Sequence, residues 1–275
     1  MARLFIFGIG YTAGRLAERL CTDGWGVAGT SRDGREGTIA FDDGDRVRAE
    51  LAAATHVLSS VPPDAAGDPV LERYGDVLAT RWLGYLSSTG VYGDVGGAWV
   101  DESAPVGGGR RRVRAEADAA WLARRARVFR LPGIYGPGRS ALERVVEGRA
   151  HRVDAPGQVF SRVHVDDVVA GVIAGFDAPA GAYNLADDLP ASQNAVVEYA
   201  ARLLGMAPPP LVAIENLPAA ARGFYAENRR VANGKAKWLL GWRPLYPDYR
   251  SGLARCFALS ATNSPASDSK PPTIA

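Results

Sequence analysis

The N-terminal stretch Leu4-Phe5-Ile6-Phe7-Gly8-Ile9-Gly10-Tyr11-Thr12-Ala13-Gly14 runs directly into Arg15-Leu16-Ala17-Glu18-Arg19-Leu20. The apolar run predicts a buried strand, the glycines a tight turn, and the residues after them an amphipathic helix. Such a turn leaves the first N–H groups of the helix unpaired, and with the helix dipole they favour a phosphate. The pattern therefore predicts a dinucleotide site that includes Gly8, Gly10, Tyr11, Thr12 and Ala13. The alternative is a glycine turn that only allows close packing of helix on strand.

Composition excludes several classes of function. The chain has 275 residues and a formal charge of +2, with basic and acidic residues interspersed, which argues against nucleic-acid or membrane partners. Cys21 and Cys256 lie far apart and without metal-ligand spacing, so we expect no metal site and a reducing, cytoplasmic location. The first residues form a strand rather than a signal peptide, and no apolar run is long enough to span a bilayer.

Short apolar runs alternate with helical patterns through the first two-thirds of the chain, which predicts an α/β fold with a doubly wound parallel sheet of the Rossmann type. The expected strands are Leu4–Phe7, Gly26–Thr30, Thr38–Phe41, His56–Ser60, Leu83–Ser87 and Arg127–Leu131. Expected helices include one that opens at Asp68-Pro69 and others over Arg114–Arg125, Leu142–Gly148 and Ser192–Leu204.

Glycine-proline turns dominate beyond Gly136 and predict a smaller C-terminal substrate lobe. We assign residues 1–135 to the dinucleotide-binding core, with 161–182 returning to it, and 136–160 and 183–262 to the smaller lobe. The segment 263–275 is rich in Ser, Pro and Asp, so a flexible tail is expected there.

The end of the second expected strand indicates which dinucleotide binds. It reads Thr30-Ser31-Arg32, and a guanidinium beside two hydroxyls suits the 2′-phosphate of NADP, whereas NAD prefers a carboxylate there. NADP is therefore expected rather than NAD, although Asp33 would offer a carboxylate one residue further on.

Further cofactor contacts are expected at the ends of the next strands. Asp42 follows the third strand and can accept a hydrogen bond from the adenine amino group, although a turn-forming role beside Asp43 is the alternative. Ser59 and Ser60 close the fourth strand, where the middle of the cofactor would pass.

Together with the glycine turn, four further segments resemble motifs of the extended short-chain dehydrogenase/reductase superfamily, and more closely its atypical branch. In order, they are Tyr85-Leu86-Ser87-Ser88-Thr89-Gly90-Val91-Tyr92-Gly93-Asp94, Arg130-Leu131-Pro132-Gly133-Ile134-Tyr135-Gly136-Pro137-Gly138, Val163-His164-Val165-Asp166-Asp167-Val168 and Tyr183-Asn184-Leu185. The segment Asn228-Arg229-Arg230-Val231-Ala232-Asn233 also looks like the atypical branch. The resemblance implies a Rossmann fold, a nicotinamide cofactor, and Pro132 and Gly133 beside that cofactor.

The resemblance also implies a catalytic Ser or Thr together with a Tyr-x-x-x-Lys pair. Ser88 stands at the hydroxyl position, with Thr89 beside it, but Gly108 and Arg112 occupy the positions of the Tyr and the Lys. Glycine cannot carry a proton, and arginine is no acid or base at neutral pH, although Arg112 can still bind the nicotinamide ribose. The usual Tyr/Lys chemistry is therefore not expected.

Two other phenols, Tyr92 and Tyr135, lie on motifs near the nicotinamide end and are candidate bases, with a packing role as the alternative. For a substrate, Arg139 and Arg162 are the candidate ligands of a phosphate or diphosphate, with solvated surface arginines as the alternative. His164 is read as a structural residue.

Two functions fit this pattern. The first is an NADP-dependent oxidoreductase or epimerase/dehydratase-like enzyme with an atypical active site, acting on a phosphorylated, nucleotide-sugar or similar small molecule. The second is a catalytically inactive NADP(H)-binding sensor or scaffold. The resemblance also implies a homodimer formed through helices of the cofactor part.

Overall fold

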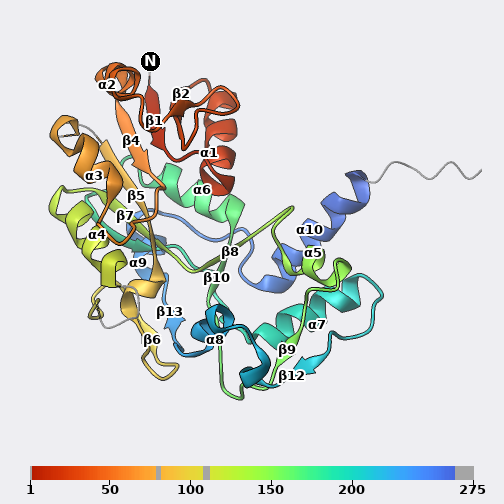
Figure 1. Cartoon of the computed structure of the whole chain (residues 1–275). Helices are drawn as coiled ribbons and strands as arrows, with labels where there is room; N and C mark the ends of the chain where they lie inside the picture. Colours follow the sequence, from red (N-terminus) through yellow and green to blue (C-terminus); the bar gives the residue numbers. More distant parts are fainter. Residues whose placement is uncertain (1, 79–81, 108–111, 264–275) are drawn as a thin grey trace, which may run out of the picture.

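The structure, a computed structural model, describes residues 2–78, 82–107 and 112–263. Its centre is a parallel sheet of seven strands in the order β11-β7-β5-β4-β1-β2-β3 (Figure 1). These strands are β1 (Arg3–Phe7), β2 (Gly26–Ser31), β3 (Ile39–Ala40), β4 (His56–Ser59), β5 (Trp82–Ser88), β7 (Arg127–Leu131) and β11 (Gly181–Asn184). The chain moves outward from β1 in one direction and from β4 in the other, which is the doubly wound arrangement. The predicted fold class is confirmed.

The six strands expected from the sequence all occur, and β7 has the expected bounds. The seventh strand, β11, was not expected as part of the sheet. It pairs with β7 in the register Tyr183↔Phe129 and Asn184↔Arg130. The assignment of residues from 183 onward to the smaller lobe is therefore corrected, because backbone pairing keeps Tyr183 and Asn184 in the sheet.

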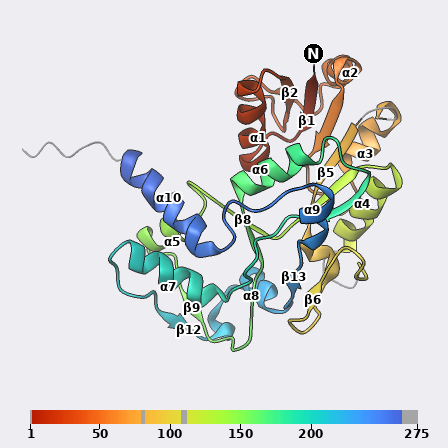
Figure 2. The same ribbon diagram turned by 180° about the vertical axis from the view of Figure 1, so that it is seen from behind.

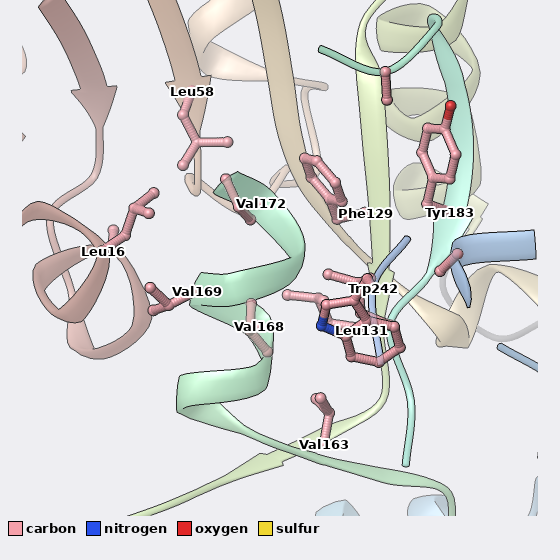
Figure 3. Packing of buried hydrophobic residues seen from close by; sticks show 14 of the residues in the cluster. Leu16, Leu58, Phe129, Leu131, Val163, Val168, Val169, Val172, Tyr183 and Trp242 are labelled. Atoms are coloured by element: carbon pink, nitrogen blue, oxygen red, sulfur yellow. The ribbon is translucent and has the colours of Figure 1, made fainter. Parts of the chain in front are cut away.

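Alternate residues of β1 face opposite sides of the sheet. Leu4 and Ile6 pack with α1 (Tyr11–Thr22) and α6 (Val165–Ala174), as Figure 3 shows for Leu16, Val168, Val169 and Val172 of the same cluster. Phe5 and Phe7 pack on the other side, among residues of three helices: α2 (Gly44–Ala53), α3 (Pro69–Tyr74) and α4 (Arg112–Ala123). Helices on both faces explain why Leu4–Phe7 of β1 is apolar and buried at every position.

Side-chain caps fix where several helices begin. The Asp68 carboxylate accepts hydrogen bonds from the backbone of Val70 and Leu71, both at 3.0 Å, and Pro69 follows it as the first residue of α3. Ser140 and Glu143 form a capping box at the start of α5 (Ala141–Val146). The starts predicted at Asp68-Pro69 and Ser192 agree with α3 and with α7 (Gln193–Leu203).

A smaller part of the chain has its own core. Residues of α5, α7 and α10 (Tyr249–Asn263) form it, and these helices lie together away from the large sheet (Figure 2). Beside them are β9 (Arg152–Val153), β12 (Leu211–Val212), the short 3₁₀ helix η3 (Ile214–Asn216) and α8 (Ala219–Tyr225). Within the described residues, no helix is both long and apolar enough to cross a membrane.

Two short parallel strand pairs connect the large sheet to the smaller part. In one, β8 (Gly133–Tyr135) pairs with β10 (Arg162–His164). In the other, β6 (Trp99–Val100) pairs with β13 (Arg230–Val231), so a C-terminal segment returns to the carboxyl-end side of the sheet. After β13 the chain enters α9 (Gly234–Leu239), which packs on β11. The segment 183–262 is thus divided between the two parts.

A buried ion pair lies beneath the carboxyl end of β5. The Arg130 guanidinium on β7 donates to both carboxylate oxygens of Asp118 on α4, at 2.7 and 3.1 Å. Arg130 also donates to the Tyr92 hydroxyl at 3.0 Å, and that hydroxyl donates to Asn184 Oδ1 at 2.8 Å. Ser87 on β5 donates to Asp118 at 2.6 Å. The network therefore joins β5, β7, β11, α4 and the 3₁₀ helix η2 (Thr89–Tyr92).

We expect Arg130→Met to lower the free energy of unfolding by about 3–5 kcal/mol, because it leaves the buried Asp118 carboxylate without its counter-charge. Arg48→Met, which removes the exposed Arg48–Asp76 pair, serves as the control and should change the free energy of unfolding far less, because solvent screens exposed charges. Urea denaturation of both variants measures the difference. Equal effects of the two substitutions would contradict a structural role of the buried pair.

Candidate functional site

A cavity of about 910 Å³ opens where the sheet meets the smaller part. Its lining includes the glycine turn after β1, the ends of β4, β5 and β7, and residues of β8, β10 and α8. Ligands of doubly wound folds bind at the carboxyl ends of the strands, and a volume of this size holds a small ligand or part of a cofactor. We take this cavity as the candidate site.

The glycine turn is held in place by hydrogen bonds to Thr30 at the end of β2. The Gly8 N–H donates to Thr30 Oγ1 at 3.1 Å and the Ile9 N–H donates to the Thr30 carbonyl at 2.7 Å. Gly8 has φ +81°, and a Cβ on it would lie 2.9 Å from Val61 Cγ2, so only glycine fits there. Thr30 is buried and supports the turn, which corrects its prediction as a direct cofactor ligand.

The first turn of α1 is open to an anion. Gly10 is its N-cap residue, no side chain caps the helix, and a Cβ on Gly10 would meet no atom within 4 Å. Gly10, Tyr11, Thr12 and Ala13 all line the cavity. Unpaired N–H groups at the positive end of a 12-residue helix fit a pyrophosphate, so these residues suit a dinucleotide.

The loop after β2 forms a compact turn around Ser31. Its Oγ accepts hydrogen bonds from the backbone of Gly34 at 3.0 Å and Arg35 at 3.1 Å, and it bonds Thr38 Oγ1 at 2.7 Å. Ser31 therefore shapes the loop, whereas Arg32 and Arg35 are exposed. Among the described residues neither guanidinium forms an ion pair. Arg35 was not predicted as a ligand, although it follows Arg32 by three residues.

Of the other predicted cofactor ligands, some line the cavity and some do not. Asp42 forms an exposed ion pair with Arg73 at 2.9 Å, so its carboxylate already has a partner. Ser59 is fully buried and does not line the cavity, which corrects its prediction as a ligand. Ser60 lines the cavity, and its hydroxyl donates to the Gly8 carbonyl. Pro132 and Gly133 form part of the wall.

Ser88 and Thr89 reach the cavity as predicted. Ser88 ends β5 and caps η2, with its Oγ accepting from the Gly90 N–H at 3.1 Å. Both residues line the cavity together with Gly90. The turn therefore presents a hydroxyl beside Pro132 and Gly133, at the place that the resemblance assigns to the reacting oxygen.

The two candidate tyrosines do not reach the cavity. Tyr92 is buried in the Arg130 network, and Tyr135 is buried against α10, with its hydroxyl 3.4 Å from the Asp248 carbonyl. Burial raises the pKa of each phenol above its ordinary value. Neither residue is among those that line the cavity, so their positions fit the packing alternative, and a role as base stays a prediction.

Arg112 does not reach the cavity either. Its side chain is 85% exposed and pairs with Glu116 at 2.7 Å. This corrects its prediction as a cofactor ligand, because the first turn of α4 directs it to solvent. Gly108 lies outside the described residues. Arg114, two positions further along α4, does line the cavity and was not predicted, because only Arg112 stands at the position of the Lys in the motif.

Arg139 and Arg162 both line the cavity. Arg162 is only 8% exposed, and its Nη1 donates to the Phe160 and Ala191 carbonyls, both at 2.8 Å. Nη2 donates to Gln193 Oε1 at 3.1 Å. Among the described residues no carboxylate forms an ion pair with it, and burial lowers its pKa. A buried guanidinium without a counter-charge is a place for a ligand anion.

Among the described residues that line the cavity, positive charges outnumber negative ones, which favours an anionic ligand. Glu227 is the only carboxylate among them, whereas the arginines are Arg114, Arg139, Arg144, Arg162 and Arg229. Phe160, Phe224 and Tyr225 add an aromatic wall. The sequence analysis did not place Arg229, Glu227 or these aromatic residues in the site. Among the described residues no group of His, Cys, Asp and Glu could hold a metal ion.

Asp187 lies behind Arg162 and is 2% exposed. Its backbone N–H donates to the Arg162 carbonyl at 2.7 Å, but both carboxylate oxygens lack a hydrogen-bond partner among the described residues. Burial raises the pKa of Asp187 to about 8, although the nearby Arg162 acts in the opposite direction. Within the described residues the Asp187 carboxylate oxygens make no hydrogen bond to the Arg162 guanidinium, which keeps its donors on Phe160, Ala191 and Gln193.

Known proteins share this architecture. A protein of unknown function from Silicibacter pomeroyi is 40% identical, with a TM-score of 0.83 over 94% of this chain and 99% of that one. dTDP-glucose 4,6-dehydratase from Bacillus anthracis, in complex with NAD, has a TM-score of 0.77 at 15% identity over 96% and 98% of the two chains. The human epimerase family protein SDR39U1, with NADPH, has a TM-score of 0.73 at 17% identity over 93% and 99%.

A curated relative, the 3-diazoavenalumate denitrifying reductase of a Streptomyces species, is 33% identical over 156 residues. The match covers 52% of this chain, and the chain spans about half the length of that relative, 49%. No family model matches the chain.

The fold is the one that the dehydratase and the epimerase family protein share. The chain belongs to the same family as the Silicibacter pomeroyi protein. The fold that the resemblance implied is confirmed.

Asp187 should make stability depend on pH near neutrality. The folded chain keeps this proton up to about pH 8, whereas an unfolded Asp loses it near pH ~4, so the free energy of unfolding falls as pH rises towards 8. Facing Asp187 are Arg162, Tyr135, Asp188 and Asp248. We expect Asp187→Asn to flatten the slope between about pH 7 and about pH 8 in urea denaturation.

Between about pH 7 and about pH 8 the titration of Asp187 is distinguished from that of two other groups whose pKa values are also shifted. The pKa of Asp167 is raised to about 6 and that of His164 is lowered to about 4, so in the folded chain both titrate at lower pH. Asp154→Asn, an exposed position, is the control and should keep the wild-type slope. A wild-type slope in Asp187→Asn would show that the proton resides elsewhere.

Proposed function

We propose that the chain is an NADP(H)-dependent oxidoreductase or epimerase/dehydratase-like enzyme that acts on a phosphorylated, nucleotide-sugar or similar small anionic molecule. The observation that carries the proposal is a single cavity that joins the uncapped N-terminus of α1 to the buried Arg162. The first suits the pyrophosphate of a dinucleotide and the second suits the anionic group of a substrate.

The choice of NADP rests on the loop after β2. Arg32 and Arg35 are both exposed on a turn that Ser31 holds closed, and two guanidinium groups suit the extra phosphate of NADP better than the ribose hydroxyl of NAD. The human relative is described with NADPH and the dehydratase with NAD, so both cofactors occur on this fold.

Each part of the lining has a distinct task in the proposed reaction. When bound, the nicotinamide supplies or accepts a hydride. Ser88 and Thr89 would orient the substrate oxygen from the end of β5, and Arg162 would hold the substrate anion, its guanidinium fixed by Phe160, Ala191 and Gln193. The aromatic walls from Phe160 and Tyr225 would shape the space for the substrate.

The second candidate, an NADP(H)-binding sensor or scaffold without catalysis, draws on a specific observation. Tyr92 and Tyr135 are committed to packing and Arg112 points to solvent, so none of these replaces the Tyr-x-x-x-Lys pair in the cavity. The open cavity and its buried Arg162 favour the enzyme, because a scaffold has no use for a desolvated anion site beside the cofactor.

Arg32→Asp should weaken NADPH binding by about tenfold to hundredfold, the range for losing one charge-assisted hydrogen bond to a phosphate, and should leave NADH binding nearly unchanged. Titration calorimetry with each cofactor measures both constants. Arg202→Asp, an exposed position on α7, is the control. Wild-type protein that binds NADH as tightly as NADPH would overturn the NADP assignment.

Ser88→Ala should lower kcat/KM by about 10²–10³-fold while NADPH affinity stays unchanged, because the hydroxyl acts on the reacting oxygen. The measurement is NADPH oxidation in a panel of nucleotide sugars and anionic carbonyl compounds. Ser103→Ala, on an exposed loop, is the control. A wild-type protein that binds NADPH but turns over no member of the panel would favour the scaffold.

A further inference from the structure

The segment Glu227–Val231 forms one wall of the cavity, and its position is fixed by pairing with distant residues. Beyond the β6–β13 register, the Asn228 carbonyl accepts hydrogen bonds from Gly97 at 2.8 Å and Val95 at 3.2 Å. The Asn228 N–H donates to Asp94 Oδ1 at 2.8 Å. This part of the C-terminal segment is therefore held against the loop that follows η2.

Arg229 extends from this wall toward the Ser88 turn. Its Nη1 donates to the Gly93 carbonyl at 2.6 Å and to Glu227 Oε2 at 2.9 Å. The Arg229 and Glu227 side chains are 17% and 11% exposed, and both residues line the cavity. Three groups thus meet at one place: the end of η2, the guanidinium, and the carboxylate that holds it.

Gly90 marks the space between Ser88 and Arg229. A Cβ on Gly90 would lie 3.3 Å from Ser88 Oγ and 3.9 Å from Arg229 Nη2. The hydroxyl and the guanidinium therefore both lie within 4 Å of the same position, and the absence of a side chain on Gly90 leaves that position open to a ligand atom.

We propose that Arg229 is a catalytic residue that, with Ser88, contacts the reacting oxygen of the substrate, and that Glu227 is the positioning residue that orients Arg229. This inference rests on the proposed function and goes beyond it, because it names the group that supplies positive charge where the Lys of the family motif is missing. The charge comes from a segment more than a hundred residues away along the chain.

The chemistry requires no proton from Arg229. In the reductive direction a hydride from NADPH forms a C–H bond at a carbonyl carbon, and the π electron pair of the C=O bond moves to the oxygen. Arg229 and Ser88 donate hydrogen bonds to that oxygen as its negative charge develops, and water then supplies the proton. An arginine is suited to the first task and not to the second, since it stays protonated.

Sulfite tests the assignment without a known substrate. It adds to C4 of the oxidised nicotinamide ring: the sulfur lone pair forms the C–S bond, the ring becomes a neutral dihydropyridine, and the sulfonate places anionic oxygens at the substrate position. The near-ultraviolet absorption of this adduct, measured on the full chain saturated with NADP⁺, gives the sulfite affinity. NADP⁺ affinity is measured separately by calorimetry.

Arg229→Gln should weaken sulfite binding by about tenfold to hundredfold and leave NADP⁺ affinity unchanged, as expected for the loss of charge-assisted hydrogen bonds. Glu227→Gln should weaken it less, because the guanidinium remains. Gly90→Ala should also weaken it, since the methyl group occupies the shared volume. Arg230→Gln is the matched control, because the Arg230 guanidinium donates to the Gly97 carbonyl and Arg230 does not line the cavity.

The outcomes separate this inference from the function on which it rests. A wild-type chain that does not bind NADP⁺ overturns both. A wild-type chain that binds NADP⁺ but forms no sulfite adduct, or an Arg229→Gln variant with wild-type sulfite affinity, overturns the role of Arg229 alone. If Arg229→Gln folds poorly, wild-type sulfite affinity in Gly90→Ala overturns it instead.

Discussion

The buried ion pair between Arg130 and Asp118 is the constraint on which the site depends. Two opposite charges removed from water are tolerated only if their hydrogen bonds are satisfied, and here Ser87, Tyr92 and Asn184 complete the network. These partners come from β5, η2 and β11, so the carboxyl ends of neighbouring strands are locked together. The same hydrogen bonds anchor the turn that carries Ser88 and Thr89. The role of Tyr92 in the structure is to link this turn to Arg130 and Asn184.

Most of the fold follows from local sequence signals. Apolar runs with glycine turns located six strands, and Asp68-Pro69 located the start of α3. β11 was missed as a sheet strand because Tyr183-Asn184 follows a region of short elements, and only its pairing with β7 shows where it belongs. At the site, Gly10 and Ser88 stand on motifs visible in the sequence and Arg162 directly precedes one; all three line the cavity, and their roles there stay predictions.

Tyr92 and Tyr135 show where such reasoning fails. Each stands between an apolar residue and a glycine, a pattern that is the same whether the ring faces the core or a ligand, and the decision comes from partners distant in sequence, Asn184 and Asp248. Arg229 is the opposite case: it lines the cavity but was not predicted as a site residue. It lies in a segment that resembles the atypical branch, but that resemblance assigned no role to it, and the pairing of β13 with β6 is what brings it to the cavity. Arginines that look alike in sequence therefore separate into solvated, structural and cavity-lining groups.

The pairing of β6 with β13 also sets the order in which the site is assembled. The sheet strands up to β7, with the glycine turn and the Ser88 turn, lie in the first half of the chain, whereas β13 and the segment before it come near the end. During synthesis the glycine turn and the Ser88 turn are therefore made well before the wall that carries Glu227 and Arg229. The cavity gains this wall only when β13 has paired with β6, so one of the last segments to be translated completes it.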